Sequence, residues 1–350
     1  MDFSINPGAL AEALQHNVAE KRSVLEIFNH VRIDAQDDRI TLTTCDAARE
    51  MAITIPASVS TAGGATLDLQ KLKATLQGLS GEIRLQTTGT TTKLVQGRRH
   101  FAFKGHDLDG WPAGIDMKDP QRVDIDASAL ADAIEAVSYC AGKQDFRIFL
   151  NGVTLMDDWA FASDGHRLAA APAPGLPTCI IPNDSLKNFC FSLRLPNATL
   201  TIGSAVEVTA DNFRYRTPRI DYMPPQMKRQ LAIPDNAASL DSQAGDIKAG
   251  INRIMPFAQS INGNGKSGTV EIKRGDAETV LLITNDGEDS IPAKFSTDTW
   301  PEVALEPAYL RDAITACGGE FKWINGGARV AQFFLPEGSD NIHVVMPKNI

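Results

Sequence analysis

The chain repeats one order of elements three times, and this internal repeat limits the possible folds more than any other feature. Each repeat opens with apolar residues four positions apart, which is the spacing of one face of an α-helix. The three pairs are Leu10 and Leu14, Leu130 and Ile134, and Ile247 and Ile251. They recur at intervals of about 120 residues, much longer than the period of a solenoid. The chain is therefore expected to contain three similar domains.

A strand hairpin is predicted after each of these helices. The strand sequences IFNHVRI, FLNGVTL and TVEIK begin the three segments, which continue through residues 41–56, 159–172 and 280–295. Asp46, Asp164 and Asn285 occupy matching places between the two strands of each hairpin. Short polar side chains of this kind favour turns. The sequence therefore predicts three hairpins at equivalent positions.

A second helix in each repeat gives the sharpest internal match. KLKATLQGL, SLKNFCFSL and YLRDAITAC align without a gap, each with a leucine followed by a basic residue. A further strand pair is predicted after each of these helices. Polar, proline-bearing connectors at residues 112–122 and 221–240 separate the repeats. We therefore predict an α+β fold of three domains, 1–118, 119–236 and 237–350, each with two helices and antiparallel sheets.

Composition narrows the class of protein. The 350 residues are 43% hydrophobic, enough for buried cores, and 43 acidic against 34 basic residues give a net charge of −9. Such a balance argues against nucleic-acid binding by bulk positive charge. The five cysteines form no C-x-x-C pair, which fits a reducing cytoplasm rather than a disulfide framework. No signal peptide and no run of 18 apolar residues is seen, so we expect a soluble cytoplasmic protein with no membrane partner.

The only candidate for catalytic chemistry is a cluster within one short segment. Ser163, Asp164 and His166 are the residue types of a serine hydrolase. A nucleophile elbow needs glycine two positions before the serine, where this chain has Phe161. No metal-ligand spacing and no dinucleotide-binding glycine motif is present. We therefore expect no metal, no cofactor and no enzyme, and keep the hydrolase as a remote alternative.

Three separated stretches resemble one family. Residues 144–153 read QDFRIFLNGV, residues 163–169 read SDGHRLA, and residues 344–347 read VVMP. They are similar to the QDxRxxLNG, TDGHRLA and VMP stretches of the bacterial DNA polymerase III β subunit, the sliding clamp family. The resemblance spans the whole chain.

The resemblance implies a non-enzymatic processivity factor. Members of the family form head-to-tail homodimers that close into a ring around duplex DNA, with helices lining the hole, and short peptides of the polymerase and the clamp loader bind to them. Two DNA-facing residues, Arg22 and Gln144, follow from family positions. Four more come from the internal repeat, namely Lys73, Lys143, Lys187 and Arg311. Contact of this kind with phosphates carries no sequence preference.

The family's peptide pocket also maps onto this chain. The implied residues are Ser163, Gly165, His166, Arg167, Leu168, Pro225, Val344, Met346, Pro347, Lys348, Asn349 and Ile350. Two stretches depart from the family pattern. Asp221 to Met227 replaces an aromatic-Pro-Asp-aromatic stretch, and Lys348-Asn349-Ile350 replaces a tail similar to Met-Arg-Leu. An alternative is therefore a specialised repair, plasmid or phage clamp with altered partner specificity.

Assembly is predicted from sheet edges. Three repeats in a row leave an unpaired edge at each end, and a ring satisfies such edges by pairing them. Candidates for this contact between the first domain of one chain and the last domain of another are Phe101, Phe103, Ile254 and Phe257. Packing inside their own domains is the alternative role for these four residues.

Overall fold

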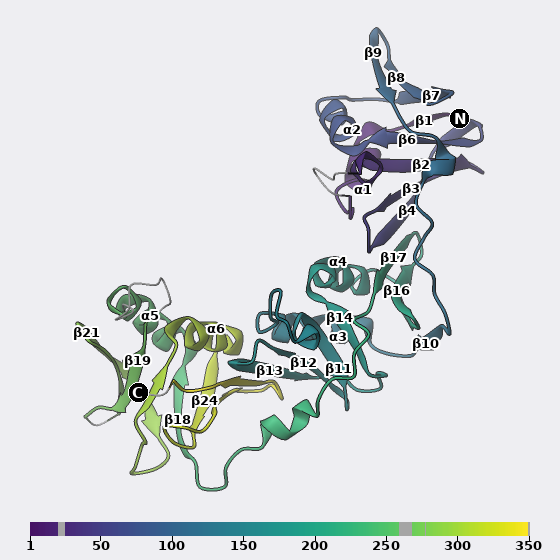
Figure 1. Ribbon diagram of the computed structural model, residues 1–350. Coiled ribbons are helices and arrows are strands. Elements are labelled where there is room, and N and C mark those ends of the chain that lie inside the picture. Colours follow the sequence, from purple (N-terminus) through teal and green to yellow (C-terminus); the bar gives the residue numbers. More distant parts are fainter. Residues whose placement is uncertain (20–24, 259–267, 277, 349–350) are drawn as a thin grey trace. The chain divides into compact units, whose positions relative to one another are not determined.

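A computed structural model describes residues 1–19, 25–258, 268–276 and 278–348 (Figure 1). The chain forms two compact units. The first holds residues 1–131 and 187–219, and the second holds residues 132–186 and 220–350. Because the expected middle domain, 119–236, is shared between the two units, the division into three domains stays a prediction.

Helices form at all six places where the repeat predicts them. In the described residues the α-helices are α1 (Pro7–Ala13), α2 (Leu69–Leu76), α3 (Ala127–Ser138), α4 (Asn183–Leu193), α5 (Ala244–Ile254) and α6 (Pro307–Cys317). Proline begins α1 and α6, where the missing N–H costs no helical hydrogen bond. Asp68 caps α2 by accepting a hydrogen bond from the Lys71 amide at 2.8 Å. Gly318, with φ of 76°, follows the last residue of α6.

Short 3-10 helices connect several of these elements. They are η1 (Glu26–Asn29), η2 (Leu108–Gly110), η3 (Ile148–Leu150), η4 (Met227–Leu231) and η5 (Met255–Phe257).

Antiparallel sheets fill the described part of the first unit. One sheet has the strand order β5-β1-β7-β8-β9, and the other has the order β10-β15-β16-β17-β4-β3-β2-β6. The strands are β1 (Asp2–Ile5), β2 (His30–Gln36), β3 (Arg39–Cys45), β4 (Glu50–Pro56), β5 (Ser58–Thr61), β6 (Gly63–Asp68), β7 (Ile83–Thr88), β8 (Thr91–Gln96), β9 (Arg99–Lys104), β10 (Gln121–Val123), β15 (Thr199–Ile202), β16 (Ala205–Ala210) and β17 (Phe213–Pro218). Pairing of β17 with β4 joins strands far apart in the sequence.

The described part of the second unit is built in the same way. Its sheets have the strand orders β14-β11-β12-β13-β26-β25-β24-β18-β22 and β21-β20-β19-β23. The strands are β11 (Gly152–Met156), β12 (Trp159–Ser163), β13 (Arg167–Pro172), β14 (Cys179–Pro182), β18 (Ala238–Gln243), β19 (Val270–Arg274), β20 (Thr279–Thr284), β21 (Gly287–Pro292), β22 (Lys294–Phe295), β23 (Val303–Leu305), β24 (Glu320–Asn325), β25 (Gln332–Pro336) and β26 (Ile342–Val345). Helices α5 and α6 contact each other in this unit.

The three predicted hairpins are confirmed, and the later strand pairs need a correction. Strands β3 and β4, β12 and β13, and β20 and β21 pair antiparallel around the expected turns. Three strands rather than two follow each second helix: β7–β9, β15–β17 and β24–β26. The first of these segments has two turn glycines, Gly89 and Gly97, both with φ of 57°. Each turn adds a strand, so the prediction counted one turn too few.

Each unit has its own hydrophobic core. In the first unit Phe3, Leu10 and Leu72 are fully buried together. In the second unit Trp323 and Phe334 are fully buried, with ring centroids 4.8 Å apart. Burying side chains of this size stabilises the fold by about 1.5–3 kcal/mol each. The helices are therefore fixed on the sheets mainly by packing.

Candidate functional site

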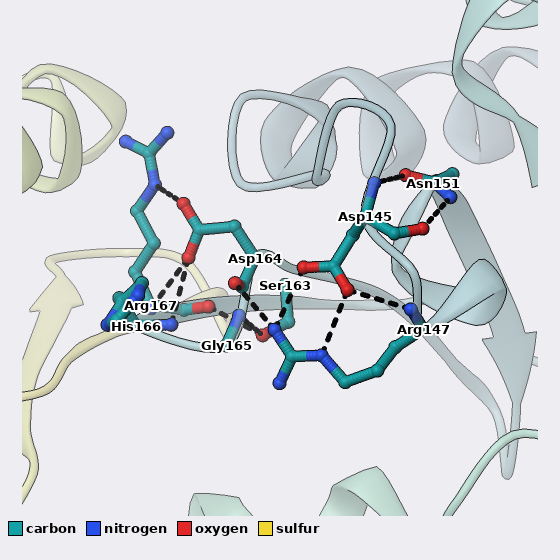
Figure 2. A network of polar contacts seen from close by, with 8 residues as sticks. All are labelled: Asp145, Arg147, Asn151, Ser163, Asp164, Gly165, His166 and Arg167. Carbon is teal, nitrogen blue, oxygen red and sulfur yellow. Dashed lines mark hydrogen bonds and ion pairs between the residues drawn. The ribbon is translucent and has the colours of Figure 1, made fainter.

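Arg147 joins two of the motifs that the sequence singled out. We name residues 144–147 the QDFR loop and residues 163–167, between β12 and β13, the SDGHR turn. The Arg147 guanidinium donates from Nε and Nη2 to the two carboxylate oxygens of Asp145, at 3.0 and 2.9 Å. It also donates from Nη2 to the carbonyl oxygen of Asp164 at 3.3 Å (Figure 2). The QDFR loop and the SDGHR turn are thus held side by side.

Asp145 is itself fixed from two sides. Hydrogen bonds from Arg147 lower the pKa of its carboxyl to about 2. Its backbone is held by Asn151, whose Oδ1 accepts from the Asp145 amide at 2.7 Å and whose Nδ2 donates to the Asp145 carbonyl at 2.8 Å. The carboxylate is therefore ionised at neutral pH, which keeps the pair with Arg147 charged.

Hydrogen bonds between side chains and backbone stabilise the conformation of the SDGHR turn. The Asp164 Oδ1 accepts from the amides of His166 and Arg167 at 3.0 and 3.1 Å, as in an Asx turn. The Ser163 hydroxyl donates to the Arg167 carbonyl at 2.7 Å. Gly165 has φ of 88°, and a Cβ built on it would lie 2.5 Å from Nη2 of Arg147. Only glycine fits this position without a shift.

These contacts rule out the hydrolase alternative. The Ser163 hydroxyl uses its hydrogen on a backbone carbonyl, and Asp164 pairs with the Arg167 guanidinium at 2.9 Å. The His166 ring stacks on Tyr309, with centroids 6.0 Å apart. In a hydrolase triad the histidine would take the serine proton and the carboxylate would orient the histidine. Here the three side chains build a turn.

Arg167 fastens the SDGHR turn to helix α6. Its Nη1 donates to Asp312 at 2.6 Å, and its Nη2 donates to the Tyr139 carbonyl at 3.1 Å. The guanidinium carbon lies 4.7 Å from the centroid of the Tyr309 ring, which is a cation–π geometry. Only 13% of the Arg167 side chain is exposed. Tyr309 and Asp312 were missed from the sequence, although they flank the Leu310-Arg311 pair of the repeat.

The third motif reaches the same turn through the sheet. Strand β26 pairs antiparallel with β13, which sets Val344 opposite Leu168, and the Met346 amide donates to the His166 carbonyl at 2.9 Å. Leu168 and Val344 are buried in one cluster with Met227 of η4. The structure thus brings these predicted residues together.

The other predicted pocket residues lie just before η4 and just after β26. Pro225 is exposed, and Met227, two positions later, supplies the contact with this cluster. The sequence signal that could have identified Met227 is its place as the first apolar residue after the proline pair. Pro347 and Lys348 follow Met346 directly and are half-buried, whereas Asn349 and Ile350 lie outside the described residues.

Two of the predicted DNA-facing residues lie in the first unit. In the first unit, Lys73 of α2 and Lys187 of α4 both lie close to His16. Burial first, and then the charges of these two lysines, lower the pKa of His16. The two lysines therefore share one basic neighbourhood around His16, and their contact with DNA stays a prediction.

In the second unit the predicted DNA-facing residues lie on two elements. Lys143 and Gln144 are exposed at the start of the QDFR loop, and Gln144 has φ of 57°. Arg311 lies on α6, where its Nη1 is 3.5 Å from the Met255 sulfur. Arg22, the other predicted DNA-facing residue, lies outside the described residues.

The predicted interface residues divide into buried and exposed pairs. Phe103 and Ile254 are 5% and 3% exposed and pack in the cores of their own units. Phe101 and Phe257 are 38% and 49% exposed. Phe101 lies on β9, an edge strand of its sheet, and Phe257 lies in η5 beside Gly287 at the start of the edge strand β21. The exposed pair thus lies at sheet edges, and the buried pair has the alternative core role.

No group of three or more His, Cys, Asp or Glu side chains in the described ranges is arranged to hold a metal ion. No helix within those ranges has the length and apolar character needed to cross a membrane.

Comparison with known proteins points to one family. A family model described as the DNA polymerase III beta subunit, N-terminal domain, matches residues 1–115. A curated relative from Haemophilus influenzae named Beta sliding clamp is 29% identical over 178 residues, which cover 48% of this chain and 49% of the relative. This match spans about half the length of that relative. A Beta sliding clamp from Buchnera aphidicola is 22% identical, with 99% of each chain covered.

Solved structures share the fold over the full chain. The crystal structure of the DNA polymerase III subunit beta from Pseudomonas aeruginosa matches with a TM-score of 0.88 at 18% identity, covering 100% of both chains. The DNA polymerase sliding clamp from Bacillus subtilis gives a TM-score of 0.88 at 19% identity. The α+β fold predicted from the repeat is confirmed. The chain is therefore similar to the DNA polymerase III β subunit family over residues 1–115, and over its full length it shares the fold of the solved sliding clamps.

Proposed function

We propose that the protein is a DNA sliding clamp. Two chains would associate head to tail into a ring around duplex DNA and tether a replicative polymerase and other factors to it. The role is non-catalytic and needs no cofactor. In this proposal each chain contributes three domains, 1–118, 119–236 and 237–350.

The observation that carries the proposal is the recurrence of one helix with one basic residue. Leu72, Leu186 and Leu310 are 0%, 7% and 0% exposed, so α2, α4 and α6 bury the same position. The next residue in each helix is basic: Lys73, Lys187 and Arg311. Equivalent positive charges in repeated domains suit a phosphate backbone that looks alike at every step of the duplex. With a net charge of −9, attraction to DNA stays local and weak enough for sliding.

Partners would bind at the surface that the SDGHR turn forms with the segment after β26. Met346 is 46% exposed there, above the buried Leu168 and Val344. A short peptide with leucine and phenylalanine anchors would bind such a surface and hydrogen-bond along its edge. Two anchors at about 1.5–3 kcal/mol each give roughly micromolar affinity after the costs of association.

A specialised repair, plasmid or phage clamp is a second candidate. The observation that favours it is the contact of Lys348 with Glu306 at 2.6 Å, which ties down a tail that differs from the family pattern. Action in the cytoplasm agrees with the five cysteines, all of which are buried and none of which forms a disulfide.

Retention on circular DNA is the experiment that tests the function. A clamp loaded on a nicked circular plasmid should stay bound through gel filtration and should leave once the plasmid is cut to a linear form. The solution mass should be twice 37.8 kDa. A monomer, or equal loss from circular and linear DNA, would contradict the ring.

A further inference from the structure

The segment after β26 is tied to the second unit at two points. The Met346 amide donates to the His166 carbonyl of the SDGHR turn at 2.9 Å, and the Lys348 amide donates to the Ala304 carbonyl of β23 at 2.8 Å. Met346 is 46% exposed. The exposed Met346 side chain therefore belongs to a short segment whose backbone is fixed at Met346 and again at Lys348.

The Lys348 side chain adds a third tie. Its Nζ lies 2.6 Å from Oε2 of Glu306 and donates to the Gly268 carbonyl at 3.0 Å. Glu306 directly precedes α6, the helix that carries Tyr309 and Asp312 to the SDGHR turn. The ammonium group therefore links the tail to the base of the helix on which the turn rests.

The Lys348 ammonium group compensates the negative charge of the nearly buried Glu306 carboxylate. Its side chain is only 11% exposed, and within the described residues its Oε1 has no hydrogen-bond donor. A buried carboxylate without compensation is costly, and removal of one member of a buried ion pair leaves the other uncompensated. Loss of the Lys348 charge would therefore disturb the start of α6 as well as the tail.

We propose that the Lys348–Glu306 ion pair positions the partner-peptide site. It holds Met346 and Pro347 against the SDGHR turn before a partner arrives, so the peptide does not have to order the tail on binding. Less ordering means tighter binding for the same contacts. This inference rests on the proposed function, because it assumes that partners dock at this surface, and it makes Lys348 a positioning residue.

The test compares Lys348→Met, Lys348→Arg and Glu306→Gln with the unchanged protein. Methionine keeps an unbranched chain of similar length and removes the ammonium group, with its charge and its hydrogen bond to the Gly268 carbonyl. The probe is a fluorescein-labelled decapeptide whose apolar residues are two leucines and one phenylalanine, followed by fluorescence anisotropy. We expect Lys348→Met and Glu306→Gln to bind the probe about tenfold more weakly. Lys348→Arg should recover most of the affinity, because it restores the cation.

Lys273→Met is the matched control. Lys273 pairs with Glu271 and Glu302 at 3.2 Å in the same unit, and neither carboxylate belongs to the tail or to the start of α6. The control removes a lysine of similar exposure, paired with carboxylates that are 37% and 65% exposed, without touching the tail, so probe affinity should stay unchanged. Equal weakening by Lys273→Met and Lys348→Met would overturn the inference and indicate general loosening of the unit.

Hydrogen exchange supplies a readout that does not depend on the peptide. The Met346 amide should exchange at least tenfold faster in Lys348→Met than in the unchanged protein, and at the unchanged rate in Lys273→Met. Unchanged exchange in Lys348→Met refutes the positioning role even if partners bind. If the unchanged protein fails to bind the probe, the partner site itself is wrong, whereas the exchange result still decides whether Lys348 holds the tail.

Discussion

Substitution of Gly165 by alanine probes how firmly Arg147 holds the SDGHR turn. Gly165 has φ of 88°, where an L-residue with a Cβ costs roughly 1–2 kcal/mol. The new Cβ would also lie 2.5, 2.7 and 3.0 Å from Nη2, Nη1 and Cζ of Arg147. The guanidinium would have to move away from Asp145 and the Asp164 carbonyl. Because 39% of the Arg147 side chain is exposed, the lost contacts add a smaller cost than the backbone strain.

Gly175→Ala is the control for the backbone cost. Gly175 has φ of 77°, and nothing lies within 4 Å of a Cβ built there. Urea unfolding should therefore show a loss of about 1–2 kcal/mol for Gly175→Ala and a measurably larger loss for Gly165→Ala. In an Arg147→Met background the extra loss at Gly165 should disappear. Equal losses at the two glycines in the unchanged background would show that Arg147 gives way freely and does not hold the turn.

Three further predictions concern assembly, DNA and pH. Phe257→Asp should shift the solution mass from dimer to monomer, because it replaces an exposed apolar side chain at the predicted interface with a charged one. An intact dimer would show that Phe257 does not belong to that interface. Reversal of Lys73, Lys187 and Arg311 to glutamate should shorten retention on circular DNA severalfold at low salt, with no sequence preference, and unchanged retention would contradict their DNA-facing role. Burial lowers the pKa of His343 to about 4, so below pH 6.5 the unfolded chain binds a proton at this histidine and the folded chain does not. The free energy of unfolding should therefore fall by about 2 kcal/mol between pH 7 and pH 5. Urea unfolding of His343→Gln should show much less of this pH dependence.

Local elements could be predicted because the signals that specify them are local. The buried leucines at 72, 186 and 310 are each followed by apolar residues four and seven positions later, and the polar turn residues Asp46 and Asp164 mark the hairpins. A residue's periodicity reports which side of its element faces a core. It does not report which other strand lies alongside.

Long-range pairing accounts for what the sequence did not reveal. The pairing of β13 with β26 joins residues nearly 180 positions apart, and only the resemblance to the family suggested that they meet. Met227, Tyr309 and Asp312 were missed for the same reason, since each acts through a partner distant in the chain. Arg147 was quoted as part of a motif, but its contact with the Asp164 carbonyl depends on two loops converging.

The ties on the SDGHR turn come from three different parts of the second unit. Arg147 holds it from the QDFR loop, Asp312 holds it from α6, and Met346 holds it from the segment after β26. Removal of one of these ties leaves the others, together with the hydrogen bond from Arg167 to the Tyr139 carbonyl, so a single substitution should loosen the turn without unfolding it. Affinity for a partner is sensitive to such loosening, because an ordered surface spares the complex the entropy of ordering it. Substitutions far from any bound peptide can therefore weaken binding while the fold persists, and this makes probe affinity a finer measure of these ties than global stability.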